Sequence, residues 1–210
     1  NFFLEEIGNQ SFRYDFENKE SNNLNLVKNI WSISKHSSIV EKIIQDKFAN
    51  NKITYCDIGN DPYLAFEINV SSYIKIKKTI LMTDNEDLYS ELNNYFSYRN
   101  TADYERLDKS NFKNISLANP DVITIIYNSN NKEILDEVVN CCPNSVVVFY
   151  GILDSRDNTY DKYNISNYSS IVAAKLDSKK TINHYSDIIE DEINSEIKAE
   201  GKKIYVLTPK

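Results

Sequence analysis

The sequence predicts an α/β protein with a doubly wound, mostly parallel sheet that closes with an antiparallel pair of strands at its C-terminal end. Two observations carry this prediction. Five apolar strand-like runs alternate with helical patterns along the chain, and strands separated by helices pair in parallel through crossovers. The 210 residues are also enough to bury a complete core. We expect one domain over residues 30–210, preceded by an appendage over residues 1–29.

The predicted strands are short runs rich in β-branched and aromatic residues. They are KITYCDI (52–58), KTILMT (78–83), ADYERL (102–107), DVITIIY (121–127) and SVVVFYG (145–151). Helices cover both faces of a doubly wound sheet, so side chains that point to either face are expected to be buried. The residues with this expectation are Ile53, Tyr55, Ile80, Ile123, Ile125, Val146 and Val148.

Apolar stripes of helical period predict the helices between the strands. Residues 38–48 carry Ile39, Ile43, Ile44 and Phe48; residues 86–96 carry Leu88, Leu92, Tyr95 and Phe96; residues 131–141 carry Ile134, Leu135, Val138 and Val139. The C-terminal part differs, because a polar stretch over residues 149–164 precedes its elements. We expect a strand over residues 169–176, an acidic helix over 185–201 and a final strand over 202–209.

Composition excludes several classes of function. The formal net charge of -7 and the pI near 5.0 argue against binding along a nucleic-acid backbone, which needs clustered Lys and Arg. No run approaches the roughly 20 apolar residues that span a bilayer, so we expect a cytoplasmic protein without a membrane partner. The three cysteines, Cys56, Cys141 and Cys142, have no spacing suited to a disulfide or a zinc site and are expected to be core thiols.

Acidic residues follow the first three predicted strands. Asp57 and Gly59 end the first strand in YCDIGNDPYLAFEI (55–68), Asp84 ends the second, and Asp108 follows the third. Ligands of open α/β sheets bind at the carboxyl ends of the strands, where a carboxylate can accept two hydrogen bonds from a ribose diol. Asp84 fits that role. An aspartate after a strand is also a common helix N-cap, and the sequence leaves this second interpretation open for all three acids.

The order of elements resembles the class I S-adenosylmethionine-dependent methyltransferases, particularly the small-molecule O-methyltransferases, over residues 30–210. The matching motifs are DIG at 57–59, the acid in ILMTDNED, and the aspartate before VITIIY. Asp61 and Tyr63 stand where the family places two further glycines. The resemblance implies a Rossmann-like methyltransferase domain whose cofactor is S-adenosylmethionine.

The same resemblance implies roles for individual residues. Asp57, Gly59, Asp84 and Asp108 would bind the cofactor, with Asp108 facing the adenine. The acceptor would be bordered by Lys35, His36, Tyr127, Asn128 and the loop over 154–161, and His36 and Tyr127 are the candidate catalytic bases. Tyr127 and Asn128 supply no carboxylate at the end of the fourth strand, so we expect no metal. His36 and His184 are far apart in sequence, and both are expected at the surface.

Three functions remain open from the sequence. The first is methyl transfer to an oxygen or nitrogen of a small molecule. The second is a catalytically inactive methyltransferase-like scaffold or subunit that binds a protein partner, which the incomplete glycine loop favours. The third is a receiver-like signalling domain. In this interpretation residues 78–96 and 120–129 would contain its first and third strands, and Lys175 would correspond to the lysine of such domains.

Overall fold

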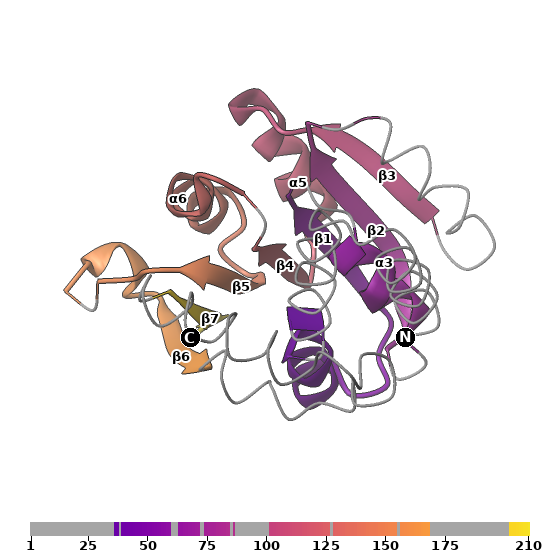
Figure 1. The fold of residues 1–210 in the computed structure, drawn as a ribbon, viewed down its shortest axis with the longest axis horizontal. Coiled ribbons are helices and arrows are strands. Elements are labelled where there is room, and N and C mark those ends of the chain that lie inside the picture. The colour runs from indigo at the N-terminus through magenta and orange to yellow at the C-terminus, as the bar shows by residue number, and fades with distance from the viewer. Residues whose placement is uncertain are drawn as a thin grey trace, which may run out of the picture.

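The fold is built on a seven-stranded sheet in the order β3-β2-β1-β4-β5-β7-β6 (Figure 1). The structure, a computed structural model, describes residues 36–37, 39–59, 63–71, 74–84, 86, 101–126, 128–154, 156–168 and 202–210. The strands are β1 (Ile53–Ile58), β2 (Ile76–Thr83), β3 (Thr101–Arg106), β4 (Val122–Ile125), β5 (Val146–Gly151), β6 (Tyr163–Tyr168) and β7 (Lys203–Pro209).

The direction of the strands confirms the predicted fold class. The first five strands are parallel, and β7 pairs antiparallel with both β5 and β6. β1 lies between β2 and β4, so the chain builds the sheet outward on one side of β1 and then crosses to the other side. In the register between β1 and β4, Asp57 lies opposite Thr124.

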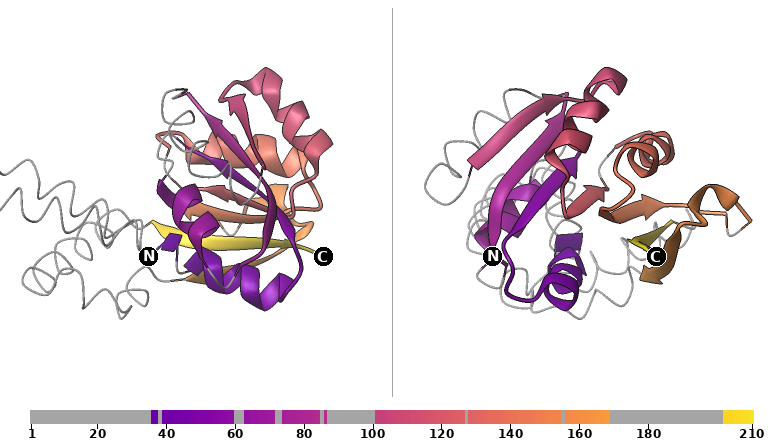
Figure 2. Two further views of the ribbon diagram at one scale, coloured as in Figure 1. Left: turned by 90° about the vertical axis from the view of Figure 1, so that its right-hand side faces the viewer. Right: turned by 180° about the vertical axis from the view of Figure 1, so that it is seen from behind.

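Helices cover both faces of the sheet. They are α3 (Tyr63–Val70), α5 (Phe112–Ala118) and α6 (Asn131–Cys141), with short 3₁₀ turns η1 (Lys109–Asn111) and η2 (Asn158–Tyr160), and residues 39–48 are also helical. Figures 1 and 2 show α5 and α6 on one face, and α3 with the helix of residues 39–48 on the other. This is the doubly wound arrangement expected from the alternating pattern.

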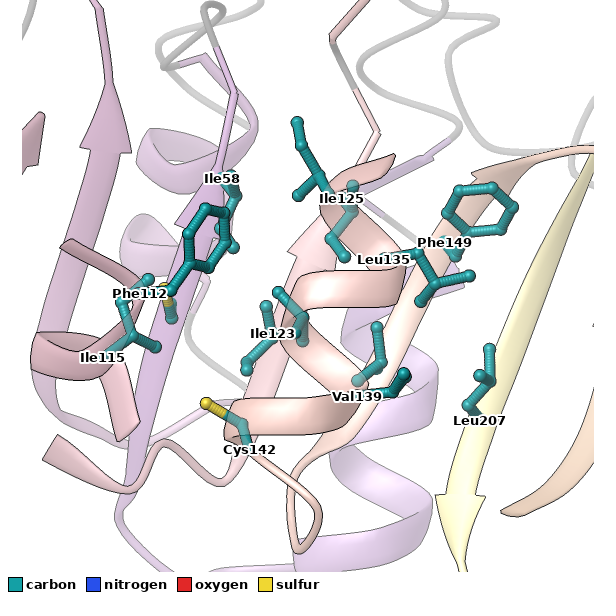
Figure 3. Packing of buried hydrophobic residues seen from close by; sticks show 14 of the residues in the cluster. Ile58, Phe112, Ile115, Ile123, Ile125, Leu135, Val139, Cys142, Phe149 and Leu207 are labelled. Atoms are coloured by element: carbon teal, nitrogen blue, oxygen red, sulfur yellow. The ribbon is translucent and has the colours of Figure 1, made fainter. Parts of the chain in front are cut away.

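Each face has its own hydrophobic core, because alternate side chains of a strand point to opposite faces. Ile53 and Tyr55 of β1 pack with α3 and the helix of residues 39–48. Cys56 and Ile58 of the same strand pack with α5 and α6, and Figure 3 shows this second core. All seven predicted core residues are buried, which confirms the sequence expectation. The predicted apolar stripes of residues 38–48 and 131–141 also face the core.

The C-terminal strands were predicted only in part. β7 matches the predicted final strand, whereas β6 lies within a stretch, YNISNY, that the sequence analysis did not assign to a strand. Residues 164–167 of β6 are exposed, so this strand carries little of the apolar alternation by which strands are detected. The predicted strand 169–176, the predicted helix 185–201, most of the predicted helix 86–96 and the appendage 1–29 lie outside the described residues.

The receiver-like alternative is wrong in its topology. In that fold the first and third strands are neighbours, because the order is 2-1-3-4-5. Here the strands assigned to those positions are β2 and β4, and β1 separates them. None of the described helices is long and apolar enough to cross a membrane.

The cysteines lie in the core formed with α5 and α6, as expected for core thiols. Cys56 and Cys142 are buried, and Cys141 is half-buried at the end of α6. The sulfur atoms of Cys141 and Cys142 are 3.4 Å apart. The hydrogen bond between the two thiols lowers the pKa of Cys141, whereas that hydrogen bond and burial raise the pKa of Cys142.

We predict that iodoacetamide modifies Cys141 before the other two cysteines. The thiolate is the reactive form, so a lowered pKa and partial exposure should make Cys141 react at least about tenfold faster than Cys142 at pH 8. A timed labelling reaction on the folded protein, read by fragment-ion mass spectrometry, measures the order. Cys56, whose pKa is raised by burial, serves as the internal control that labels only after unfolding. Earlier modification of Cys142 would contradict the lowered pKa of Cys141.

Candidate functional site at the carboxyl ends of the central strands

The candidate site lies where the order of strands reverses beside β1. Ligands of open α/β sheets bind in the crevice at the carboxyl ends of the strands at such a point. Gly59 follows β1, Asp84 follows β2 and Asp108 follows β3 by two residues, while Asn128 lies beyond β4. The parallel pairing of these strands brings all four residues to the same edge of the sheet.

Asp57 is held inside the sheet by a chain of hydroxyl groups. Its side chain is 4% exposed. The Thr124 hydroxyl donates to Oδ1 of Asp57, and the Tyr55 hydroxyl lies 2.8 Å from Thr124 Oγ1. Since the Thr124 hydroxyl has a single hydrogen, Tyr55 donates to Thr124 while Thr124 donates to Asp57. This chain of hydroxyl groups therefore fixes one side-chain oxygen of the buried Asp57 at the point where the strand order reverses.

Gly59 and Asp84 occupy the next positions along this edge. The Gly59 amide donates to Met82 O at 3.0 Å, which extends the β1–β2 ladder by one hydrogen bond. Asp84 is exposed directly after β2. An exposed carboxylate at this edge can accept hydrogen bonds from a ligand.

Asp108 makes the contact that the capping interpretation predicts. Its Oδ1 accepts hydrogen bonds from Ser110 N at 2.8 Å and from Ser110 Oγ at 2.9 Å, and these bonds lower the pKa of Asp108. Asp108 is thereby the N-cap of η1. Beside it lies a small pocket of about 80 Å³, whose apolar wall includes Phe112 and Ile134.

Two asparagines tie together the ends of three strands. Asn128 Nδ2 donates to Ile58 O of β1 at 2.7 Å. Asn131 Nδ2 donates to Ile126 O, just after β4, at 2.8 Å and to Tyr150 O of β5 at 2.7 Å. These bonds join the carboxyl ends of β1, β4 and β5 through side chains, at a position where the ladder between the strands has ended.

The side-chain oxygen atoms of the same two asparagines differ from the nitrogen atoms in their hydrogen bonding. Within the described part of the chain, Asn128 Oδ1 and Asn131 Oδ1 are buried and have no hydrogen-bond partner. A buried polar atom without a partner costs about 1 to 3 kcal/mol. Both asparagines line a pocket of about 420 Å³ that also includes Tyr150, Gly151 and Lys202.

Gly151 has a steric reason to be glycine at this pocket. A Cβ atom at residue 151 would lie 2.5 Å from Cζ of Phe149, so any side chain there would displace the buried Phe149 ring. The glycine at the end of β5 thus keeps the wall of the pocket in place.

His36 corrects a sequence expectation. It was expected at the surface, but it is 3% exposed and its ring centroid lies 5.2 Å from that of Tyr150. The imidazole packs against the ring of Tyr150, a residue that lines the 420 Å³ pocket. The role of His36 as a base stays a prediction, and so does that of Tyr127. Tyr127, Lys35 and His184 lie outside the described residues.

The loop over 154–161 is fastened to α6 by Lys132. Lys132 Nζ lies 2.8 Å from Asp136 Oδ1 and 3.4 Å from Asp157 Oδ2, and it also contacts the Tyr160 hydroxyl. Tyr160 donates to Asp136, and burial together with this bond raises the pKa of Tyr160 to about 12. Asp154 and Asp157 accept hydrogen bonds from the backbone within the loop, so their carboxylates stabilise its turns.

A metal centre is not formed by the residues that can be described. In this part of the chain, no group of three or more His, Cys, Asp or Glu side chains lies close enough to hold an ion. The expectation of a metal-free site stays a prediction.

Some residues of the site were missed by sequence reasoning. Thr124 and Asn131 were not singled out, although Thr124 is a polar residue inside the apolar run VITI and Asn131 belongs to the polar run NSNN directly after that strand. A polar side chain within a buried strand needs a partner, so this signal marks Thr124 as a hydrogen-bonding residue without identifying Asp57 as its partner.

Comparison with known proteins supports the fold through structure alone. No model of a known protein family matches the chain, and no curated protein matches it. The plantazolicin methyltransferase BpumL, in complex with a monoazolic desmethylPZN analog and SAH, is 13% identical, with a TM-score of 0.53 over 99% of this chain and 96% of that chain. With a triazolic analog and SAH, the same enzyme is 12% identical, with a TM-score of 0.51 over 99% and 97%.

A further solved structure is more distant. A putative precorrin-6Y C5,15-methyltransferase domain from Corynebacterium diphtheriae is 14% identical, with a TM-score of 0.42 over 63% of this chain and 82% of that chain. The likeness to BpumL shows that the chain has the Rossmann-like fold found in class I methyltransferases.

We predict that Thr124→Val lowers the free energy of unfolding by about 2 kcal/mol, because it removes the hydrogen bond to a buried carboxyl group without changing the shape of the side chain. Tyr55→Phe is the matched variant. It removes only the outer bond of the chain and should cost about 1 kcal/mol. Urea denaturation of the three proteins measures both values. The hydroxyl chain would be refuted if Thr124→Val were as stable as the unsubstituted protein or more stable than Tyr55→Phe.

Proposed function

We propose that the chain is an S-adenosylmethionine-dependent methyltransferase that transfers a methyl group to an oxygen or nitrogen of a small molecule. The observation that carries this proposal is the reversal of strand order beside β1, which gathers Asp57, Gly59 and Asp84 at one edge. The likeness to BpumL, a methyltransferase with SAH bound, supports the same assignment.

The residues at this edge suit a cofactor with a ribose and a positive charge. Asp84 is exposed and can accept hydrogen bonds from both ribose hydroxyls. The apolar wall formed by Phe112 and Ile134, next to Asp108, suits the adenine ring. Asp57 is buried, so in this proposal it supports the edge from within the sheet through its hydrogen bond with Thr124. Acidic side chains at the edge also favour a cation over an anion.

In this proposal the protein contributes placement more than acid or base chemistry. When bound, S-adenosylmethionine supplies an activated methyl group on a sulfonium. The pocket of about 420 Å³ at the ends of β4 and β5 holds the acceptor next to the cofactor edge. Holding two reactants in line converts a bimolecular step into an effectively unimolecular one. The asparagine bonds that fasten β1, β4 and β5 to one another keep the two subsites in a fixed relation.

A catalytically inactive scaffold is the second candidate, and one observation favours it. The Gly59 amide is already bonded to Met82 O, and the sequence has no further glycine between residues 60 and 63. A phosphate-free cofactor can still bind through side chains such as Asp84, so cofactor binding separates the two candidates.

The deciding experiment is isothermal titration with S-adenosylhomocysteine (SAH) and S-adenosylmethionine. The methyltransferase proposal predicts saturable heat for both ligands and an increase in melting temperature. Adenosine monophosphate serves as the control, because a phosphate placed near the acids of this edge is expected to bind more weakly. Absence of heat and of a thermal shift at millimolar SAH would overturn the proposal and favour the scaffold.

We predict that Asp84→Asn binds S-adenosylmethionine at least about tenfold more weakly, since a charge-assisted pair of hydrogen bonds to the ribose is worth about 1.5 to 3 kcal/mol. The melting temperature should change little, because asparagine caps a helix nearly as well as aspartate. Asp46→Asn, an exposed acid on the helix of residues 39–48, is the control and should bind normally. Unchanged affinity in folded Asp84→Asn would assign Asp84 to capping alone.

A further inference from the structure

We infer that the methyl acceptor presents an N–H group, such as a primary amine on an apolar skeleton, to the side-chain oxygens of Asn128 and Asn131. This inference deepens the proposed function and rests on it. It starts from the two buried amide oxygens that have no partner among the described residues and that belong to side chains lining the 420 Å³ pocket.

The orientation of both amides is fixed by their nitrogen atoms. Asn131 Nδ2 gives one hydrogen to Ile126 O and one to Tyr150 O, at 2.8 and 2.7 Å. Turning this amide by half a turn would place its oxygen against two carbonyl oxygens. Asn128 is fixed in the same way by Ile58 O at 2.7 Å. The oxygen of each side chain is thus the atom left for a ligand, and an amide oxygen can only accept hydrogen bonds.

The occupant must therefore bring hydrogen-bond donors. A carboxylate has none, and it would lie against two amide oxygens that carry partial negative charge. A hydroxyl group has a single hydrogen and can satisfy one of the two oxygens. A neutral primary amine has two hydrogens, so it can satisfy both while its lone pair stays available for attack. Of these groups, the amine fits the two asparagines best.

The rest of the pocket wall indicates which kind of carbon skeleton the acceptor amine has. Tyr150 and Ile152 contribute apolar surface, and the charged residues Lys132, Glu133 and Lys202 lie elsewhere along the wall. An aromatic amine, or an aliphatic amine in its neutral form, can place its skeleton on the apolar part and its nitrogen at the asparagines. In the reaction the nitrogen lone pair forms the N–C bond while the C–S bond breaks, its electron pair stays on sulfur, and the methylated nitrogen releases a proton to water.

Three probes of matched shape test the inference. Aniline, phenol and benzoate have the same ring and offer two, one and no hydrogens at neutral to weakly alkaline pH. Each is titrated into the full chain, with and without SAH, and binding is followed by the amide NMR signals of Tyr150 and Gly151. We expect aniline to bind at least about tenfold more tightly than phenol, in line with the cost of leaving a buried acceptor unpaired, and benzoate to bind most weakly.

Two variants assign the preference to the asparagines. Asn128→Ala removes one of the oxygens and should reduce the aniline-to-phenol ratio to near unity, whereas Asn140→Ala, an exposed asparagine on α6, should leave the ratio unchanged. Asn131→Ala should act like Asn128→Ala if it folds; if it does not, Asn128→Ala alone decides. Equal or tighter binding of phenol or benzoate, a preference that survives Asn128→Ala, or no binding of any probe at millimolar concentration would overturn the inference.

The same samples separate this inference from the proposed function. SAH binding without a preference for aniline overturns the amine acceptor and leaves the methyltransferase proposal standing. A preference for aniline without SAH binding overturns methyl transfer and leaves an amine-binding pocket. Binding of SAH together with the aniline preference supports both.

Discussion

The parallel pairing of β1 with both β2 and β4 is the constraint on which the rest of the structure depends. Because β1 is flanked on both sides, its residues 55–58 pair with both neighbouring strands, and the side chains of β1 are buried on both faces. The chain must then leave the sheet in opposite directions on either side of β1, and the helices it forms cover the two faces. Open α/β sheets bind their ligands at the carboxyl ends of the strands at such a point, which is where Gly59, Asp84 and Asn128 lie.

Polar side chains are concentrated at this point although the surrounding core is apolar. Asp57 is kept in the sheet by Thr124 and Tyr55, and the asparagines at 128 and 131 replace ladder bonds where the strands diverge. The two amide oxygens left without partners among the described residues are a destabilising feature. Local departures from good packing rules are expected at functional sites.

The sequence predicts the framework of this molecule well and the site only in outline. The strands β1, β2, β4 and β5 follow from long apolar runs, because burial on both faces leaves a strong signal in sequence. β6 was missed because Asn164, Ser166 and Asn167 give an exposed edge strand a polar composition. His36 packs against Tyr150, more than a hundred residues away, and Asn131 bonds to Ile126, just after β4, and to Tyr150 of β5. Contacts set by tertiary packing leave no periodic pattern that a single sequence can reveal.

The central claim is that the edge beside β1 holds an adenosyl cofactor. A crystal structure of the chain grown with SAH tests it most directly. The account predicts the ribose within hydrogen-bond distance of Asp84 and the adenine against Phe112 and Ile134, with the sulfur directed toward the pocket lined by Asn128 and Asn131. SAH bound at the amino ends of the strands, or bound at this edge with the ribose away from Asp84, would contradict the account.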